Sequence, residues 1–206
     1  MTAVVGIVRN GRVHLGADSA GVSGWSLTLR ADEKVFRNGP YAMGFTTSYR
    51  MGQLLRYAFT PPEPTGDLPR FMVTTFVDSV RACLKDGGWA TKNAEQESGG
   101  QFLVGIAGRL FIVDSDYQVG EPHARYAAVG CGADIALGAL YATTELPVRK
   151  RMQVALEAAE RHSSGVHGPF AYTTTRRHDD TKAEHDAVAC HGRRRAAGHH
   201  QRLGHR

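Results

Sequence analysis

The second residue of the chain, Thr2, carries a hydroxyl group that could act as a nucleophile. A threonine hydroxyl is a poor nucleophile at neutral pH and needs a base beside it. Removal of Met1 would supply this base, because a free α-amine titrates at about pH 8 and can carry a proton at physiological pH. Thr2 alone is more simply a tolerated second residue, so the sequence that follows it has to decide between the two interpretations.

Two charged residues follow Thr2 at equal spacing. Asp18 lies sixteen positions after Thr2, and Lys34 lies sixteen positions after Asp18. A lysine ammonium near the threonine oxygen would favour the developing alkoxide, and a buried aspartate would keep the lysine charged. In most proteins such a pair would be a surface ion pair. The places of Asp18 at a predicted strand end and of Lys34 at a predicted strand start favour the catalytic interpretation.

Turn signals and apolar patterns predict the elements that would position these residues. Asn10-Gly11 joins strands over 4–9 and 12–17, because this dipeptide accepts the positive φ angles of a tight turn. A second hairpin joins 34–37 to 41–45, and the proline-rich loop 60–69 separates two helices. The remaining predicted elements are helices over 48–59, 71–85, 133–143 and 148–162, and strands over 101–107, 109–114, 126–129 and 170–174. This order lacks the strand–helix alternation of a doubly wound sheet.

The segment from Thr2 to Ser19 and the Lys34-Val35 pair resemble the opening of proteasome β subunits and of the simpler bacterial ATP-dependent threonine peptidase. In this family of N-terminal-nucleophile hydrolases a threonine begins the first strand, and an aspartate and a lysine follow at the spacings found here. The resemblance implies an α+β fold, a four-layer αββα sandwich, over residues 1–175. It also implies that the free α-amine of Thr2 is the general base.

The same resemblance implies residues that support the chemistry. Gly44, within the segment 42–47, corresponds to a glycine whose backbone N–H binds the oxyanion; a glycine that merely permits close packing is the alternative. Cys131 replaces a serine that supports the threonine amine, and its thiol is a weaker hydrogen-bond partner. As a nucleophile in its own right, Cys131 has no histidine at a suitable spacing. Ser164 fits a late serine of the family, whereas Arg161 stands where an aspartate belongs.

A substrate pocket is expected beside the nucleophile. Ala20, Val22 and Phe45 lie where they could line it, and Val22 aligns with a threonine that binds the substrate backbone in the family. The sequence thus predicts a threonine-type hydrolase of amide or peptide bonds that uses no metal or cofactor. The resemblance implies peptide or protein substrates, a homo-oligomeric ring and an ATPase partner.

Two alternatives to this function remain open. An amidase for small molecules would use the same first residues. A catalytically silent structural homologue would keep the fold and lose the chemistry, which the changes at Cys131 and Arg161 would fit.

Composition narrows the class of protein further. The chain has 206 residues, of which 42% are hydrophobic, and this suits a single globular domain. Its start lacks the basic region and long apolar stretch of a secretion signal, and no 18 apolar residues run together. The three cysteines form neither a disulfide framework nor a metal-binding spacing. We therefore expect a soluble cytoplasmic protein.

The net charge of +5 is concentrated in the last segment, 176–206. This segment holds eight Lys or Arg, four Asp or Glu and six of the ten histidines, with few large apolar residues. It cannot offset the entropy of ordering by burying a core, so we expect a disordered tail or a sequence translated in a shifted frame. A basic arm for nucleic acid and a histidine-rich metal site are less favoured, because the remainder of the chain is nearly neutral and the histidines have no regular spacing.

Overall fold

Residues 1–93 and 96–176 are described by the computed structural model. Met1–Thr175 forms one compact unit. Apart from Arg176, the predicted tail lies outside the described residues.

The first sheet is built around the N-terminal hairpin. Strands β1 (Val4–Arg9) and β2 (Arg12–Ala17) pair antiparallel, and the two residues between them, Asn10 and Gly11, have φ angles of 50° and 69°. Both positive values are those that a tight primed turn requires, and the hairpin prediction is confirmed. Strand β12 (Tyr126–Val129) pairs with β1, and β13 (Ala171–Thr174) pairs with β2, which gives the order β12-β1-β2-β13.

The second sheet contains the other predicted hairpins. Its strand order is β11-β10-β9-β6-β5, and all neighbours are antiparallel. The strands are β5 (Val35–Asn38), β6 (Tyr41–Phe45), β9 (Phe102–Ile106), β10 (Arg109–Val113) and the short β11 (Val119–Gly120). Strand β11 was not predicted from the sequence, because a two-residue strand has no periodicity to detect.

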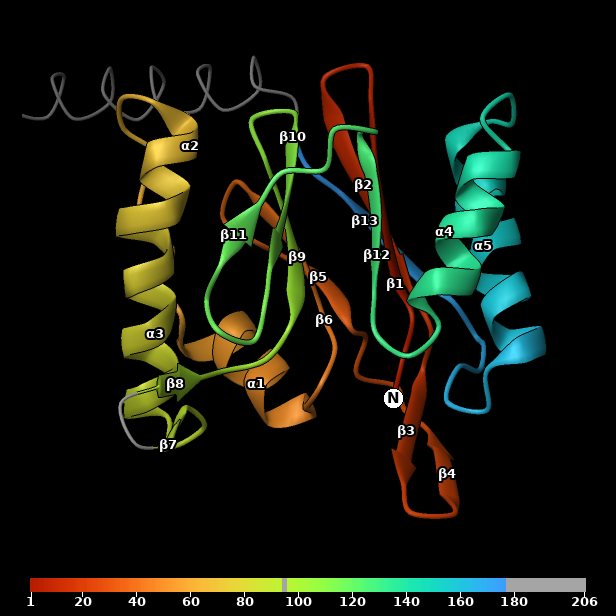
Figure 1. The fold of residues 1–206 in the computed structure, drawn as a ribbon, viewed down its shortest axis with the longest axis horizontal. Helices are drawn as coiled ribbons and strands as arrows, with labels where there is room; N and C mark the ends of the chain where they lie inside the picture. Colours follow the sequence, from red (N-terminus) through yellow and green to blue (C-terminus); the bar gives the residue numbers. More distant parts are fainter. Residues whose placement is uncertain (94–95, 177–206) are drawn as a thin grey trace, which may run out of the picture. The chain divides into compact units, whose positions relative to one another are not determined.

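Helices cover the outer face of each sheet (Figure 1). On one side lie α1 (Tyr49–Gln53), α2 (Leu68–Phe71) and α3 (Val77–Asp86), with π-helical turns over Leu54–Ala58 (η1) and Met72–Phe76 (η2). On the other side lie α4 (Ala133–Ala142) and α5 (Val148–His162). None of these described helices is both long and apolar enough to cross a membrane.

The second helical segment begins earlier than predicted, inside the expected proline-rich loop. The Asp67 side chain accepts a hydrogen bond of 3.1 Å from the Arg70 N–H and so caps the first turn. Pro69 is tolerated in that turn, because the first N–H groups of a helix have no partner within the helix. The cap rather than the last proline therefore sets the start of this helix.

Three apolar clusters hold the four layers together. Along β1, Val5 and Ile7 pack against α4 and α5, whereas Val4 and Val8 face the second sheet. The third cluster joins the second sheet to helices α1 to α3 through residues such as Phe45 and Phe76. Because successive strand residues point to opposite faces, a strand with both faces buried lies in the middle of the sandwich. The predicted αββα architecture is confirmed.

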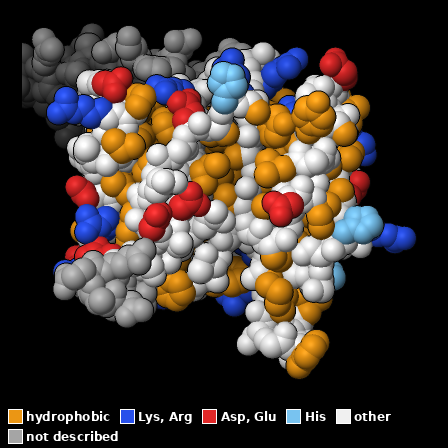
Figure 2. Space-filling model, in the orientation of Figure 1, with side chains coloured by type: hydrophobic (Ala, Val, Ile, Leu, Met, Phe, Trp, Pro, Cys, Tyr) orange, Lys and Arg blue, Asp and Glu red, His pale blue; other side chains and the backbone are white. Residues whose placement is uncertain are grey.

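Two short hairpins were not predicted. One joins β7 (Thr91–Asn93) to β8 (Gln96–Ser98). The other joins β3 (Ala20–Ser23) to β4 (Ser26–Leu29) and projects from the body of the molecule (Figure 1). Figure 2 shows hydrophobic side chains exposed on this projection, and every residue of β4 is exposed. The sequence analysis did not single out this strand, although Ser26-Leu27-Thr28-Leu29 alternates polar and apolar residues.

Candidate active site

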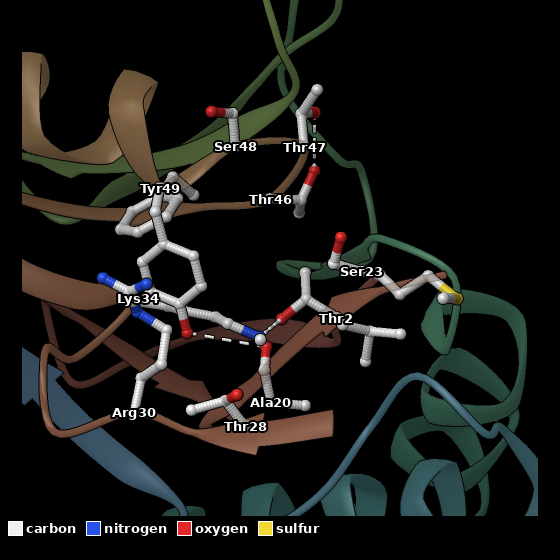
Figure 3. Close-up of a pocket in the computed structure, with 14 residues that line it drawn as sticks. Thr2, Ala20, Ser23, Thr28, Arg30, Lys34, Thr46, Thr47, Ser48 and Tyr49 are labelled. Carbon is white, nitrogen blue, oxygen red and sulfur yellow. Dashed lines mark hydrogen bonds between the residues drawn. The ribbon is translucent and has the colours of Figure 1, made fainter. Parts of the chain in front are cut away.

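Thr2 lies two residues before β1 and is 2% exposed. Its hydroxyl Oγ1 donates a hydrogen bond to Oδ1 of Asp18 and accepts one from Nζ of Lys34, and both contacts are short. Figure 3 shows Thr2 and Lys34 meeting in a cavity, with the hydrogen bond between them dashed. The structure therefore brings together the three residues that were predicted from their spacing.

Asp18 follows the last residue of β2 and is completely buried. Besides Thr2, its carboxylate accepts hydrogen bonds from the backbone N–H of Ala3 at 3.0 Å and of Ala20 at 2.9 Å, and from Nζ of Lys34 at 2.9 Å. A buried charge is tolerated only when it is paired and hydrogen-bonded, and both conditions hold here. The backbone donors fix the position of the Asp18 carboxylate, so this carboxylate is a fixed counter-ion for Lys34.

Lys34 directly precedes β5, and its side chain is 3% exposed. Thr2 and Asp18 come from strands of the first sheet, so the site lies where the two sheets face each other. Burial lowers the pKa of Lys34, and the negative charge of Asp18 partly offsets this shift. A lysine in such surroundings is an acid that can exchange its proton more readily than one in water.

Cys131 lies in the turn between β12 and α4, next to the backbone of Thr2. The Thr2 N–H donates to its Sγ at 3.2 Å, and Sγ lies 3.4 Å from the Thr2 carbonyl oxygen. The thiol also lies 3.4 Å from the hydroxyl of Ser163. Ser164, the predicted supporting serine, has an exposed side chain, and Arg161 is exposed in the last turn of α5.

Gly44 lies away from the reacting groups. It sits inside β6, opposite Val35 on one side and Leu103 on the other. A Cβ atom at this position would lie 2.6 Å from Cγ1 of Val4, so the glycine permits the two sheets to approach each other. Gly44 is absent from the lining of the cavity beside Thr2. The structure thus favours the packing interpretation of Gly44 over an oxyanion donor.

The cavity beside Thr2 has a volume of about 310 Å³. Ala20, Val22 and Phe45, the three residues predicted for a substrate pocket, all line it. The sequence did not single out Arg30 or Tyr49, because both depend on the unpredicted β3–β4 hairpin and on the start of α1. The full lining comprises Met1, Thr2, Ala20, Gly21, Val22, Ser23, Thr28, Arg30, Lys34, Phe45, Thr46, Thr47, Ser48 and Tyr49.

Thr47 is a further residue of the cavity that the sequence did not reveal. Its φ angle is 63°, in the left-handed region that residues other than glycine rarely adopt. Among the residues that the structure describes, its backbone N–H has no acceptor. A donor without a partner on the wall of a cavity can bind a group of the ligand.

The site offers a buried hydroxyl that already shares a proton with a carboxylate and faces an ammonium group. With Met1 attached, the nitrogen of Thr2 is an amide and cannot act as a base. Met1 is 55% exposed and itself lines the cavity, so it stands where it could be removed.

Comparison with known proteins places the fold. No protein-family model matches the chain, and no curated protein sequence matches it. Thiobacillus denitrificans BPH has a similar structure, with a TM-score of 0.72 and 21% identity, over 85% of this chain and 98% of the other. The complex of that protein with epoxomicin gives a TM-score of 0.71, at 21% identity and over 85% and 99% of the two chains.

Two further structures are similar at lower scores. Eukaryotic HslV from Trypanosoma brucei has a TM-score of 0.60 and 17% identity, over 84% of this chain and 98% of the other. Anbu, the ancestral beta-subunit from Yersinia bercovieri, has a TM-score of 0.60 and 15% identity, over 84% and 81%. At these identities the similarity shows a shared fold. The chain therefore has the proteasome-like αββα fold of these structures.

Proposed function

We propose that the chain is a threonine-type hydrolase of amide or peptide bonds, with Thr2 as its nucleophile once Met1 has been removed. The observation that carries this proposal is the contact of the Thr2 hydroxyl with both Lys34 and Asp18 at the edge of a cavity. A surface ion pair would not explain why both charges are buried around a threonine hydroxyl. The proteasome-like fold supports the same chemistry.

In the proposed reaction, the free α-amine of Thr2 takes the proton from Oγ1 as the oxygen attacks an amide carbonyl. The ammonium of Lys34 stabilises negative charge on Oγ1, and Asp18 holds the ammonium in place. Collapse of the tetrahedral intermediate passes the proton to the leaving amine and leaves an acyl ester on Thr2. A water molecule, activated by the same α-amine, then hydrolyses the ester.

The oxyanion donor in this proposal is the backbone N–H of Thr47 rather than that of Gly44. Thr47 lines the cavity, its N–H is free within the described chain, and its positive φ angle is of the kind that concentrates at functional sites. Two contacts hold its side chain: Thr46 Oγ1 at 3.1 Å, and the Gln101 N–H, which donates to Thr47 Oγ1 at 3.2 Å. A donor fixed before the substrate arrives stabilises the oxyanion without reorganisation.

Cys131 and Ser163 complete the proposal as neighbours of the amine. The Thr2 nitrogen that becomes the α-amine already lies 3.2 Å from the thiol. Peptide or protein substrates, a homo-oligomeric ring, an ATPase partner and a cytoplasmic location are the further parts of the proposal, and they rest on the resemblance to proteasome-like peptidases.

Intact-mass spectrometry with an epoxyketone probe tests the nucleophile. We expect the purified chain to lack Met1 and to gain one probe molecule on Thr2. The variant Thr2→Ala should remain unlabelled. The control Thr74→Ala, which alters an exposed helical threonine whose hydroxyl donates to the Arg70 carbonyl, should be labelled at the wild-type rate. Retention of Met1, or an unlabelled Thr2 in a chain with intact circular dichroism, would overturn the proposal.

A further inference from the structure

The cavity beside Thr2 has a one-sided charge. Arg30 and Lys34 line it, whereas no aspartate or glutamate of the described chain does so. The aspartates that pair with these cations are not part of the cavity lining. Asp18, the partner of Lys34, is completely buried, and Asp32 is the partner of Arg30. A group that enters the cavity therefore contacts two cationic side chains and no carboxylate of the lining.

Of the two cations, Arg30 has the greater hydrogen-bonding capacity to spare, because two of the three N–H donors of Lys34 are already used. The ammonium of Lys34 is engaged by Thr2 and Asp18. Arg30 binds Asp32 in a fork, through Nε at 2.7 Å and Nη2 at 2.6 Å. Its third nitrogen, Nη1, has no acceptor among the residues that the structure describes. The guanidinium thus keeps one free donor group while its other edge is fixed.

Arg30 is also held in position by an aromatic ring. Its guanidinium carbon lies 3.8 Å from the centroid of the Tyr49 ring, and Asp32 fixes its orientation. The Tyr49 hydroxyl donates to the Ala20 carbonyl at 3.5 Å, which ties the ring to the wall of the cavity. Figure 3 shows Arg30 and the hydroxyl of Thr28 on the same side of Thr2. A stacked and ion-paired guanidinium loses little entropy when it binds a further anion.

We propose that this cavity selects an acidic side chain on the acyl side of the scissile bond, with Arg30 as the residue that determines this specificity. The proposal rests on the hydrolase function proposed above and names its substrate class. A carboxylate would accept hydrogen bonds from Nη1 of Arg30 and from the hydroxyl of Thr28, which lines the same cavity. A lysine or arginine side chain would face two cations and find no carboxylate on the wall.

Three fluorogenic peptides that differ only in the residue before the cleaved bond test the specificity. We expect kcat/KM of the full chain to be roughly tenfold higher for glutamate than for leucine, as one added charge-assisted hydrogen bond implies, and lowest for arginine. The variant Arg30→Gln should lower kcat/KM for the glutamate peptide about tenfold more than for the leucine peptide, so that the preference for glutamate is lost. A merely structural effect of the substitution would instead lower all three rates alike.

The matched control is Arg109→Gln. Arg109 forms a fork with Glu121 and has a side chain 37% exposed, against 36% for Arg30, but it lies outside this cavity. This variant should keep the wild-type order of the three peptides. Equal rates for the glutamate and arginine peptides, or a glutamate preference that survives in Arg30→Gln, would overturn the inference while leaving the hydrolase function intact.

A binding measurement separates failure of the inference from failure of the proposed function. Acetylated peptide amides ending in glutamate, leucine or arginine are titrated into the full chain and followed by ligand-observed NMR. If Thr2 is neither labelled nor active, tighter binding of the glutamate peptide that is lost in Arg30→Gln still supports the acid-selective cavity. Equal binding of the three peptides overturns it whether or not the chain is an enzyme.

Discussion

The buried pair of Asp18 and Lys34 makes a sharp prediction about stability. The variant Lys34→Met keeps most of the side-chain volume and removes the charge. Asp18 would then be left completely buried without its counter-ion, although the backbone N–H groups of Ala3 and Ala20 would still bind it. Removal of one partner of a buried pair is costly, because the other charge remains in a medium of low dielectric constant.

The size of the effect follows from the geometry. At the 2.9 Å between Lys34 Nζ and Asp18 Oδ1, the attraction is about 6 kcal/mol for an effective dielectric constant of about 20. Loss of the ammonium also removes its own desolvation cost of several kcal/mol, which reduces the net effect. We expect Lys34→Met to lower the free energy of unfolding by about 3 kcal/mol at neutral pH.

Urea unfolding followed by circular dichroism, at one protein concentration, measures this loss. The control Arg109→Met breaks the pair with Glu121, in which both side chains are 37% exposed, and should cost less than about 1 kcal/mol. The double variant Asp18→Asn/Lys34→Met should be more stable than Lys34→Met, even if the single variant does not fold. A loss below about 1 kcal/mol for Lys34→Met would refute the reasoning, since it would mean that the Asp18 charge is not confined by the fold.

Three further predictions concern the chemistry and the packing. Because burial lowers the pKa of Lys34 from its ordinary value of 10.5, the ammonium is present only below that lowered pKa, and the alkaline fall of kcat/KM should come below pH 10.5. Gly44→Ala should destabilise the fold by about 1–3 kcal/mol in urea unfolding, through the clash with Val4, while the folded fraction still reacts at Thr2 with the epoxyketone. Cys131→Ser should react with the probe at least as fast as the wild type, because a hydroxyl is the better hydrogen-bond partner; iodoacetamide should slow the wild type, whose thiol is exposed, and not this variant.

Much of the fold could be predicted because its strands have turns and buried faces that leave a pattern. The hairpin at Asn10-Gly11 was found from a dipeptide that accepts positive φ angles. The β3–β4 hairpin was missed because the alternation in Ser26-Leu27-Thr28-Leu29 spans only four residues, and its leucines are exposed instead of buried in a core. The early start of α2 was missed because the prolines predict a loop up to residue 69, whereas the Asp67 cap lets the helix begin at Leu68 with Pro69 in its first turn.

Some residues of the site could be predicted from their spacing along the chain, whereas the role of others depends on tertiary contacts. The spacing of Thr2, Asp18 and Lys34 reflects strand lengths and register, so it could be read along the chain. The two interpretations of Gly44 could not be separated, because a sequence does not show whether a glycine faces a ligand or a packed strand. Arg30 was missed because its importance comes from the Tyr49 ring and from Asp32, which only the folded chain brings around it.

Thr47 is not a glycine, yet it presents to the cavity a backbone N–H that has no acceptor among the described residues. A left-handed φ angle costs a threonine of order 1 kcal/mol or more, so the surrounding structure has to hold the residue there. The Thr47 hydroxyl supplies that hold, because it contacts Thr46 Oγ1 and accepts a hydrogen bond from the Gln101 N–H. The backbone of Thr46 is fixed by the same strand end, since its N–H donates to the Gln101 carbonyl at 3.0 Å. A glycine adopts a positive φ angle without help from its neighbours, whereas Thr47 is held there by its side-chain contacts. These contacts fix the position of its backbone N–H donor.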